Sequence, residues 1–61
     1  MNSLELKGKW NQVKGDLKKK YASLTDDDLK AAEGEYDKLV GILQEKTGKG
    51  KEEVEKELQS L

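Results

Sequence analysis

The chain has 61 residues, of which 41% are charged and 33% hydrophobic, and its net charge is −1. A chain of this length forms one small domain that buries only about 60% of its unfolded surface, which leaves little core to wall a deep ligand cavity. Histidine and cysteine are both absent, which removes the usual neutral-pH base, the thiolate nucleophile, disulfides and thiolate metal sites.

The mean hydropathy of −1.00 approaches that of disordered chains, so hydrophobic periodicity has to decide whether the chain folds. Proline and phenylalanine are absent, strand-forming residues are few, and the apolar residues follow helical spacing throughout. We therefore expect a single all-α domain over residues 1–61. Its four helices are expected at about 3–21, 26–33, 35–47 and 51–60.

The first expected helix, over about 3–21, rests on an apolar stripe with spacings of three and four residues. At about 100° per residue these side chains fall on one narrow helix face. Either Asn2 or Ser3 can cap the start of this helix, with Glu5 reaching back. The stripe consists of Leu6, Trp10, Val13, Leu17, Tyr21 and Leu24.

The stretch "LTDDDL" at 24–29 has the features of a helix start. Thr25 at the N-cap and Asp28 at the third helical position form a reciprocal capping pair, and Leu24 and Leu29 are spaced as a hydrophobic staple. Acidic residues in a first turn also suit the helix macrodipole. Three adjacent helical side chains point about 100° apart and cannot converge on one ion. We expect no metal site and no cofactor here.

The second half of the chain continues the helical stripe after a break at Gly34. The "TGKGK" stretch at 47–51 stops one helix and turns the chain. Apolar residues predict the buried faces of the helices after residue 26: Leu29, Ala32, Tyr36, Leu39, Val40, Leu43, Val54, Leu58 and Leu61.

Two segments of the chain resemble each other. "GKWNQVKGDLKKK" (8–20) and "GEYDKLVGILQEK" (34–46) share Gly, an aromatic, an aliphatic, Gly, Leu and Lys at matching positions. Two packed α-hairpins of similar design would explain this match. Because any two amphipathic helices share a period, chance similarity is the alternative.

Gly8 and Gly15 lie roughly opposite Trp10 on the expected first helix, and Gly34 and Gly41 lie similarly opposite Tyr36. Glycine on a solvated helix face costs about 1 kcal/mol relative to alanine. Three interpretations stay open. The glycines let another helix of the domain approach closely, or they form an external contact face with Asn11 and Gln12, or they are locally loose without a role.

Charge is unevenly distributed along the chain. Residues 1–21 carry six lysines against two acids, and residues 22–61 carry six lysines against eleven acids. We expect the two halves to neutralise each other within the molecule. Lysines on the first helix favour nucleic acid only weakly, because a lysine-rich last turn also suits the macrodipole. A nucleic-acid partner is therefore not expected.

Other functional classes are also not expected. No nucleophile elbow or phosphate-binding glycine loop occurs, so we expect no enzyme and no catalytic residues. The longest apolar run, residues 39–43, is far shorter than the roughly 20 residues of a membrane span, and no secretory signal is visible. The sequence predicts a cytoplasmic monomer without a membrane partner.

The ordered combination of several short motifs resembles the CsbD family of bacterial proteins, which includes the YjbJ-like proteins. The resemblance covers nearly the whole chain and implies a compact four-helix fold of two packed hairpins, a role in the general stress response, and no catalytic residues. It implies no particular molecular activity. The motifs are Gly8-x-Trp10-x-Gln12-x-Lys14-Gly15, the stretch 24–29, Gly34-x-x-Asp37-x-Leu39-x-Gly41-x-x-Gln44, and Gly48.

The leading hypothesis is a non-enzymatic stress-response protein that acts as a hydrophilic protectant. The alternative is a small binding module that contacts a protein or nucleic acid through the first helix, with Gly8, Asn11, Gln12 and Gly15 as the contact face. The residues expected to hold the structure are Trp10, Leu24, Thr25, Asp28, Leu29 and Tyr36.

Overall fold

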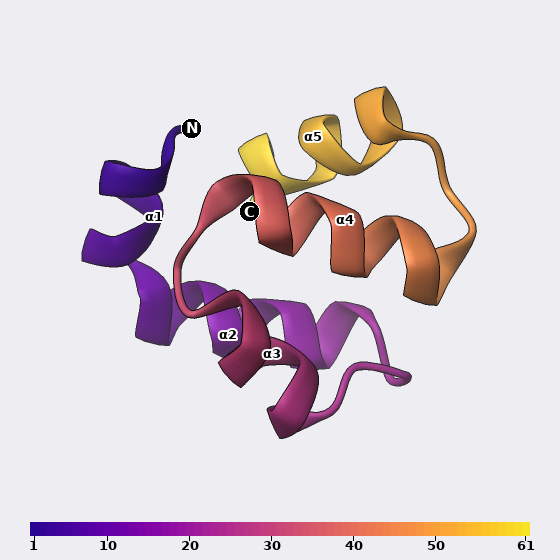
Figure 1. Ribbon diagram of the computed structural model, residues 1–61, viewed down its shortest axis with the longest axis horizontal. Coiled ribbons are helices and arrows are strands. Elements are labelled where there is room, and N and C mark those ends of the chain that lie inside the picture. The colour runs from indigo at the N-terminus through magenta and orange to yellow at the C-terminus, as the bar shows by residue number, and fades with distance from the viewer.

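The computed structural model describes all 61 residues as five α-helices without strands, which confirms the all-α class (Figure 1). The three later helices match their expected bounds to within one residue at each end. They are α3 (Asp26–Ala32), α4 (Tyr36–Thr47) and α5 (Lys51–Gln59).

The single helix expected over 3–21 is wrong. The chain instead forms α1 (Ser3–Gly8) and α2 (Trp10–Lys20), which are separated by Lys9 at φ −110° and ψ 11°. The bend lets α1 pack against α4 as well as α2, so that Leu6 is completely buried. Glycine's low helix propensity at position 8 makes a break at this point inexpensive.

The domain centres on α4, which packs against α1, α3 and α5. Figure 1 shows α4 lying between α5 above and the pair α2 and α3 below. The expected arrangement of four helices in two packed hairpins is therefore not matched in detail, because the fold has five helices and one of them is central.

The sequence repeat coincides with helix starts. The two aromatic residues of the repeat, Trp10 and Tyr36, are the first residues of α2 and α4. In each case a glycine precedes the aromatic residue by two positions. The shared pattern thus corresponds to two long helices, each introduced by a short one.

One hydrophobic core holds the helices together, and no polar or charged side chain is buried in it. Trp10, Tyr21 and Tyr36 are only half-buried and pack against this core. Leu61, expected on the buried face of the last helix, is exposed. The core consists of Leu6, Val13, Leu17, Leu24, Leu29, Ala32, Leu39, Val40, Leu43, Val54 and Leu58.

Helix α3 begins with a capping box. The Thr25 hydroxyl accepts the Asp28 N–H at 3.1 Å, and the Asp28 carboxylate accepts the Thr25 N–H at 3.1 Å. Leu24 and Leu29, on either side of this turn, are both buried. The capping box thereby satisfies the N–H groups of Thr25 and Asp28 within the chain itself.

Helix α4 is capped from a distant part of the chain. The side chain of its N-cap residue, Glu35, makes no capping hydrogen bond. The backbone N–H of Tyr36 instead donates to the hydroxyl of Ser3, 33 residues earlier, at 3.0 Å. Asn2, and not Ser3, caps α1 by accepting the Glu5 N–H at 2.9 Å. The two cap candidates of the sequence therefore serve two different helices.

Candidate functional site

The four residues of the expected contact face, Gly8, Asn11, Gln12 and Gly15, are all exposed. A Cβ atom added to Gly8 or Gly15 would meet nothing within 4 Å, and the same holds for Gly41. The interpretation that the glycines admit another helix of the same domain is therefore wrong for Gly8, Gly15 and Gly41. It is confirmed for Gly34, which is buried and where an added Cβ would lie 2.9 Å from Cγ of Lys7 on α1. We call Gly8, Asn11, Gln12 and Gly15, together with the flanking Lys7, Lys9 and Lys19, the outer face of α1 and α2.

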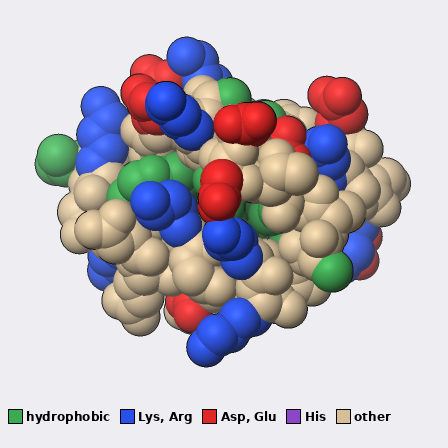
Figure 2. Space-filling model, turned by 90° about the horizontal axis from the view of Figure 1, so that it is seen from below, with side chains coloured by type: hydrophobic (Ala, Val, Ile, Leu, Met, Phe, Trp, Pro, Cys, Tyr) green, Lys and Arg blue, Asp and Glu red, His purple; other side chains and the backbone are tan.

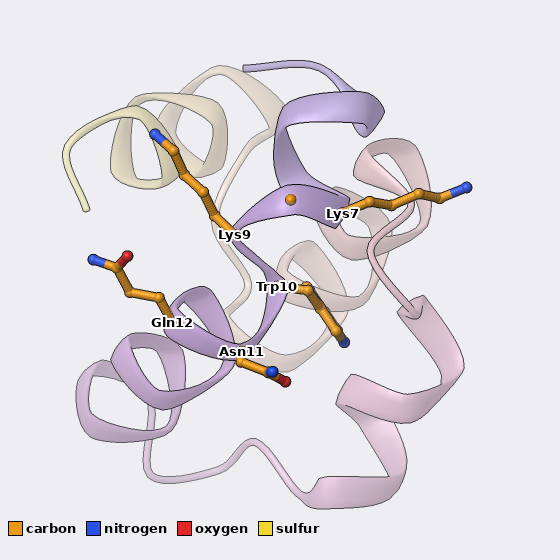
Figure 3. A pocket seen from close by; sticks show the side chains of 6 residues that line it. Lys7, Lys9, Trp10, Asn11 and Gln12 are labelled. Atoms are coloured by element: carbon orange, nitrogen blue, oxygen red, sulfur yellow. The ribbon is translucent and has the colours of Figure 1, made fainter.

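A hollow of about 520 Å³ lies at the junction of α1 and α2. In Figure 3 the side chains of Lys7 and Lys9 point to opposite sides, and Gln12 lies on the side of Lys9. Side chains that diverge in this way cannot surround a small molecule, so the hollow is an open surface feature. It is lined by Lys7, Gly8, Lys9, Trp10, Asn11 and Gln12.

Trp10 connects this hollow to the core. The indole is half-buried and packs against the core cluster, and it also lines a second hollow of about 310 Å³ between α2 and α3, where Leu29 is the other apolar residue. The sequence placed Trp10 on the core-facing stripe but gave no sign that its ring has an accessible edge. The break after Gly8 opens the hollow beside it.

The lysines of residues 1–21 are mostly without an ion-pair partner. Only Lys18 forms one, with Asp26 on α3 at 2.5 Å. The other three ion pairs join residues within 22–61: Lys38 with Glu35, Lys46 with Asp28, and Lys49 with Glu57. The expected neutralisation between the two halves is thus limited to one pair, and the other five lysines of residues 1–21 remain unpaired.

Local electrostatics keeps the paired carboxylates ionised. The hydrogen bond from Lys18 lowers the pKa of Asp26 below its ordinary value, and Lys14 adds a weaker attraction. The Thr25 N–H lowers the pKa of Asp28, and Lys38 lowers the pKa of Glu35. Hydrogen bonds and nearby cations both favour the charged form. The lowered pKa values are those expected of carboxylates that form ion pairs or cap helices.

Tyr36 joins three helices. Its backbone N–H binds Ser3 of α1, and its hydroxyl donates to Glu55 of α5 at 3.1 Å. Burial raises the pKa of Tyr36, and the bond to Glu55 raises it further. The side chain therefore stays neutral and acts as a structural link.

A second polar cluster joins the end of α2 to α5. The ammonium of Lys49 lies 5.5 Å from the centre of the Tyr21 ring and pairs with Glu57. The Tyr21 hydroxyl and the second carboxylate oxygen of Glu57 are buried without a hydrogen-bond partner.

No group of three or more metal-ligating side chains comes together anywhere in the chain, and none of the helices could cross a lipid bilayer.

These features define a class of small helical proteins with one apolar core, an open charged surface and no enclosed site. The chain belongs to the CsbD-like family, whose model matches residues 5–56.

Three relatives cover nearly the whole chain. UPF0337 protein PA4738 of Pseudomonas aeruginosa is 51% identical over 61 residues, which is 100% of this chain and 94% of the relative. UPF0337 protein YjbJ of Escherichia coli O6:H1 is 47% identical over 98% of this chain and 87% of its own length. UPF0337 protein ECA0631 of Pectobacterium atrosepticum is 48% identical over 95% of this chain and 84% of its own length. No solved structure matches the chain significantly.

Proposed function

We propose that this protein is a non-enzymatic stress-response protein of the bacterial cytoplasm that protects other molecules through its hydrophilic surface. The main support for the proposal is that the fold exposes very little apolar surface. Although 33% of the residues are hydrophobic, only Leu4, at 81%, and Leu61, at 41%, are large hydrophobic residues with high exposure.

Charges of both signs are spread over the exposed surface. Figure 2 shows lysines and acids over one face of the molecule, with hydrophobic side chains confined to small patches between them. Such a surface holds water and offers few sites for non-specific association. A compact, highly charged protein of this kind can remain dispersed among partly dehydrated macromolecules and keep them apart.

The non-enzymatic character rests on residue types and geometry together. Histidine and cysteine are absent, and the side chains around the α1–α2 hollow diverge (Figure 3). A general base, a nucleophile and a place for substrate between them are the minimum for a catalytic site. The α1–α2 hollow provides no enclosed place for a substrate beside such a pair of groups.

The protectant role is tested by drying or heating a labile enzyme with this protein and with an equal mass of a neutral control protein. We expect more residual enzyme activity with this protein, and equal protection by both would refute the proposal. Leu4→Glu is the matched variant. Because Leu4 is the most exposed hydrophobic residue, a mechanism based on hydration predicts unchanged protection. Loss of protection in Leu4→Glu would indicate apolar client binding instead.

A second function, as a binding module, is favoured by a separate observation. Five lysines of residues 1–21 have no ion-pair partner, and the glycines beside them are open to solvent. A pull-down from stressed bacterial lysate tests for a specific partner, with Lys9→Gln/Lys19→Gln as the negative control. If both baits recover the same molecules, the outer face of α1 and α2 is not the binding surface.

A further inference from the structure

We propose that the outer face of α1 and α2 binds the phosphate backbone of nucleic acids. This inference rests on the second function above, that of a binding module, and it is independent of the protectant role. It reverses the expectation from sequence, because that expectation assumed that the positive charge of the first 21 residues is neutralised within the molecule.

The charge on this face is mainly positive, although the half-buried Asp16 lies one helical turn from Gln12 and from Lys19. Lys7 and Lys9 form no ion pair, and residues 6–15 contain no acid. Lys19 extends the series, because residues 11, 15 and 19 follow one another at four-residue spacing on one side of α2. Unpaired lysines on one surface are the electrostatic footprint of a polyanion site.

The arrangement suits an extended anion and not a single small one. Lys7 and Lys9 point to opposite sides (Figure 3), so their ammonium groups cannot hold one phosphate together. They can hold successive phosphates of a chain that runs across the junction. In the first turn of α2, Asn11 and Gln12 are exposed and offer amide donors for phosphate oxygens.

The glycines allow a nucleic-acid backbone to approach the protein closely. Positions 8 and 15 have no atom within 4 Å of where a Cβ would lie, so a nucleic-acid backbone can contact the helix backbone there. Together these features give a surface of alternating positive charge, amide donors and open backbone.

Two other occupants fit less well. A second copy of the chain would have to present a complementary acidic surface. At the start of α3, however, Asp26 and Asp28 already pair with Lys18 and Lys46, and the exposed start of α5 mixes charges of both signs. A lipid surface requires a broad apolar face next to the basic one, and on α1 only Leu4 is an exposed large hydrophobic residue.

Binding is measured by the fluorescence anisotropy of a labelled 20-nucleotide DNA, as a single strand and as a duplex, between 20 and 200 mM KCl. The test variant is Lys9→Gln/Lys19→Gln. The control is Lys51→Gln/Lys56→Gln, which changes the net charge equally on another face. All four lysines are exposed, and circular dichroism checks that each variant folds. Lys19→Gln alone serves as the test variant if the double variant does not fold.

We expect saturable binding at 20 mM KCl that weakens with salt. The test variant should bind about tenfold more weakly and reduce the slope of log K against log salt by about 1.4 on a single strand, since each lost phosphate contact accounts for about 0.7. The control should bind within about twofold of the unmodified protein.

Flat curves with both DNA forms would overturn the proposal. So would equal weakening by both double variants, which indicates net charge alone. The proposal would also be overturned if polyglutamate competed as effectively as unlabelled DNA. The same holds if the protein bound phosphatidylglycerol vesicles as tightly as it binds DNA. The protectant role predicts that both double variants protect an enzyme equally, so the two proposals fail separately.

Discussion

Replacing Gly15 by alanine should make the protein more stable. Gly15 lies inside α2, and its open surroundings mean that an added methyl group meets no neighbour within 4 Å. Alanine is better than glycine by about 0.8–1.0 kcal/mol in the interior of an exposed helix. For a domain of this size, 1 kcal/mol corresponds to about 4–8 °C in the melting temperature.

Gly34→Ala is the matched control with the opposite sign. Gly34 has φ +77°, and an added Cβ would lie 2.9 Å from Cγ and 3.3 Å from Cα of Lys7. The left-handed backbone alone costs a non-glycine residue about 1–2 kcal/mol, and the contact with the Lys7 backbone adds strain. We expect Gly34→Ala to lower the melting temperature by at least as much as Gly15→Ala raises it.

Urea unfolding followed by both Trp10 fluorescence and circular dichroism measures these changes. The slope with urea should stay constant, so that the midpoints report stability directly. If Gly15→Ala leaves the protein no more stable, or destabilises it, then the outer face of α2 is covered in solution and is not an open surface. If Gly34→Ala is neutral, the turn between α3 and α4 does not depend on a left-handed glycine pressed against Lys7.

Three further predictions follow from individual side chains. Ser3→Ala removes the acceptor for the Tyr36 N–H and should cost about 1 kcal/mol of unfolding free energy; no loss in urea unfolding would show that the cap is not formed. Tyr21→Phe removes a buried hydroxyl that has no partner and should be neutral or stabilising by up to about 1 kcal/mol; a marked loss would reveal a hidden partner. The pKa of Asp28 is lowered mainly by its bond from the Thr25 N–H, so its contribution is present above the ordinary aspartate pKa and is lost as the pH falls through the lowered value. Acid unfolding of Asp28→Asn should therefore show a smaller loss of stability between about pH 5 and pH 2 than that of the unmodified protein.

Helix type and most helix bounds could be predicted from the sequence because local signals agree with one another there. The "LTDDDL" stretch combines a cap, a charged first turn and two flanking leucines, and α3 begins at Asp26 as expected. The break at Lys9 could not be read from the apolar stripe, since Leu6 and Trp10 keep helical spacing across it. The repeat could have predicted the break, because Gly34 precedes the start of α4 at Tyr36 by two residues, as Gly8 precedes the start of α2 at Trp10.

The residues of the candidate contact face could be predicted from the sequence, but whether another helix covers them could not. Helical geometry put Gly8 and Gly15 opposite the core, and whether another helix covers them depends on tertiary packing. In the structure that side is open, because α1, α3 and α5 all pack on α4. The prediction that residues 1–21 and 22–61 neutralise each other's charge failed for the same reason. Sequence gives the number of lysines and acids, while ion pairing depends on which helices face each other.

The bond between Ser3 and Tyr36 also bears on how the protein is made. Translation proceeds at roughly 5–20 residues per second, so the 33 residues between these two groups take roughly two to seven seconds to synthesise. Throughout that interval α1 has no α4 to pack against. Leu6, completely buried in the finished domain, therefore cannot reach its final environment until α4 has been synthesised.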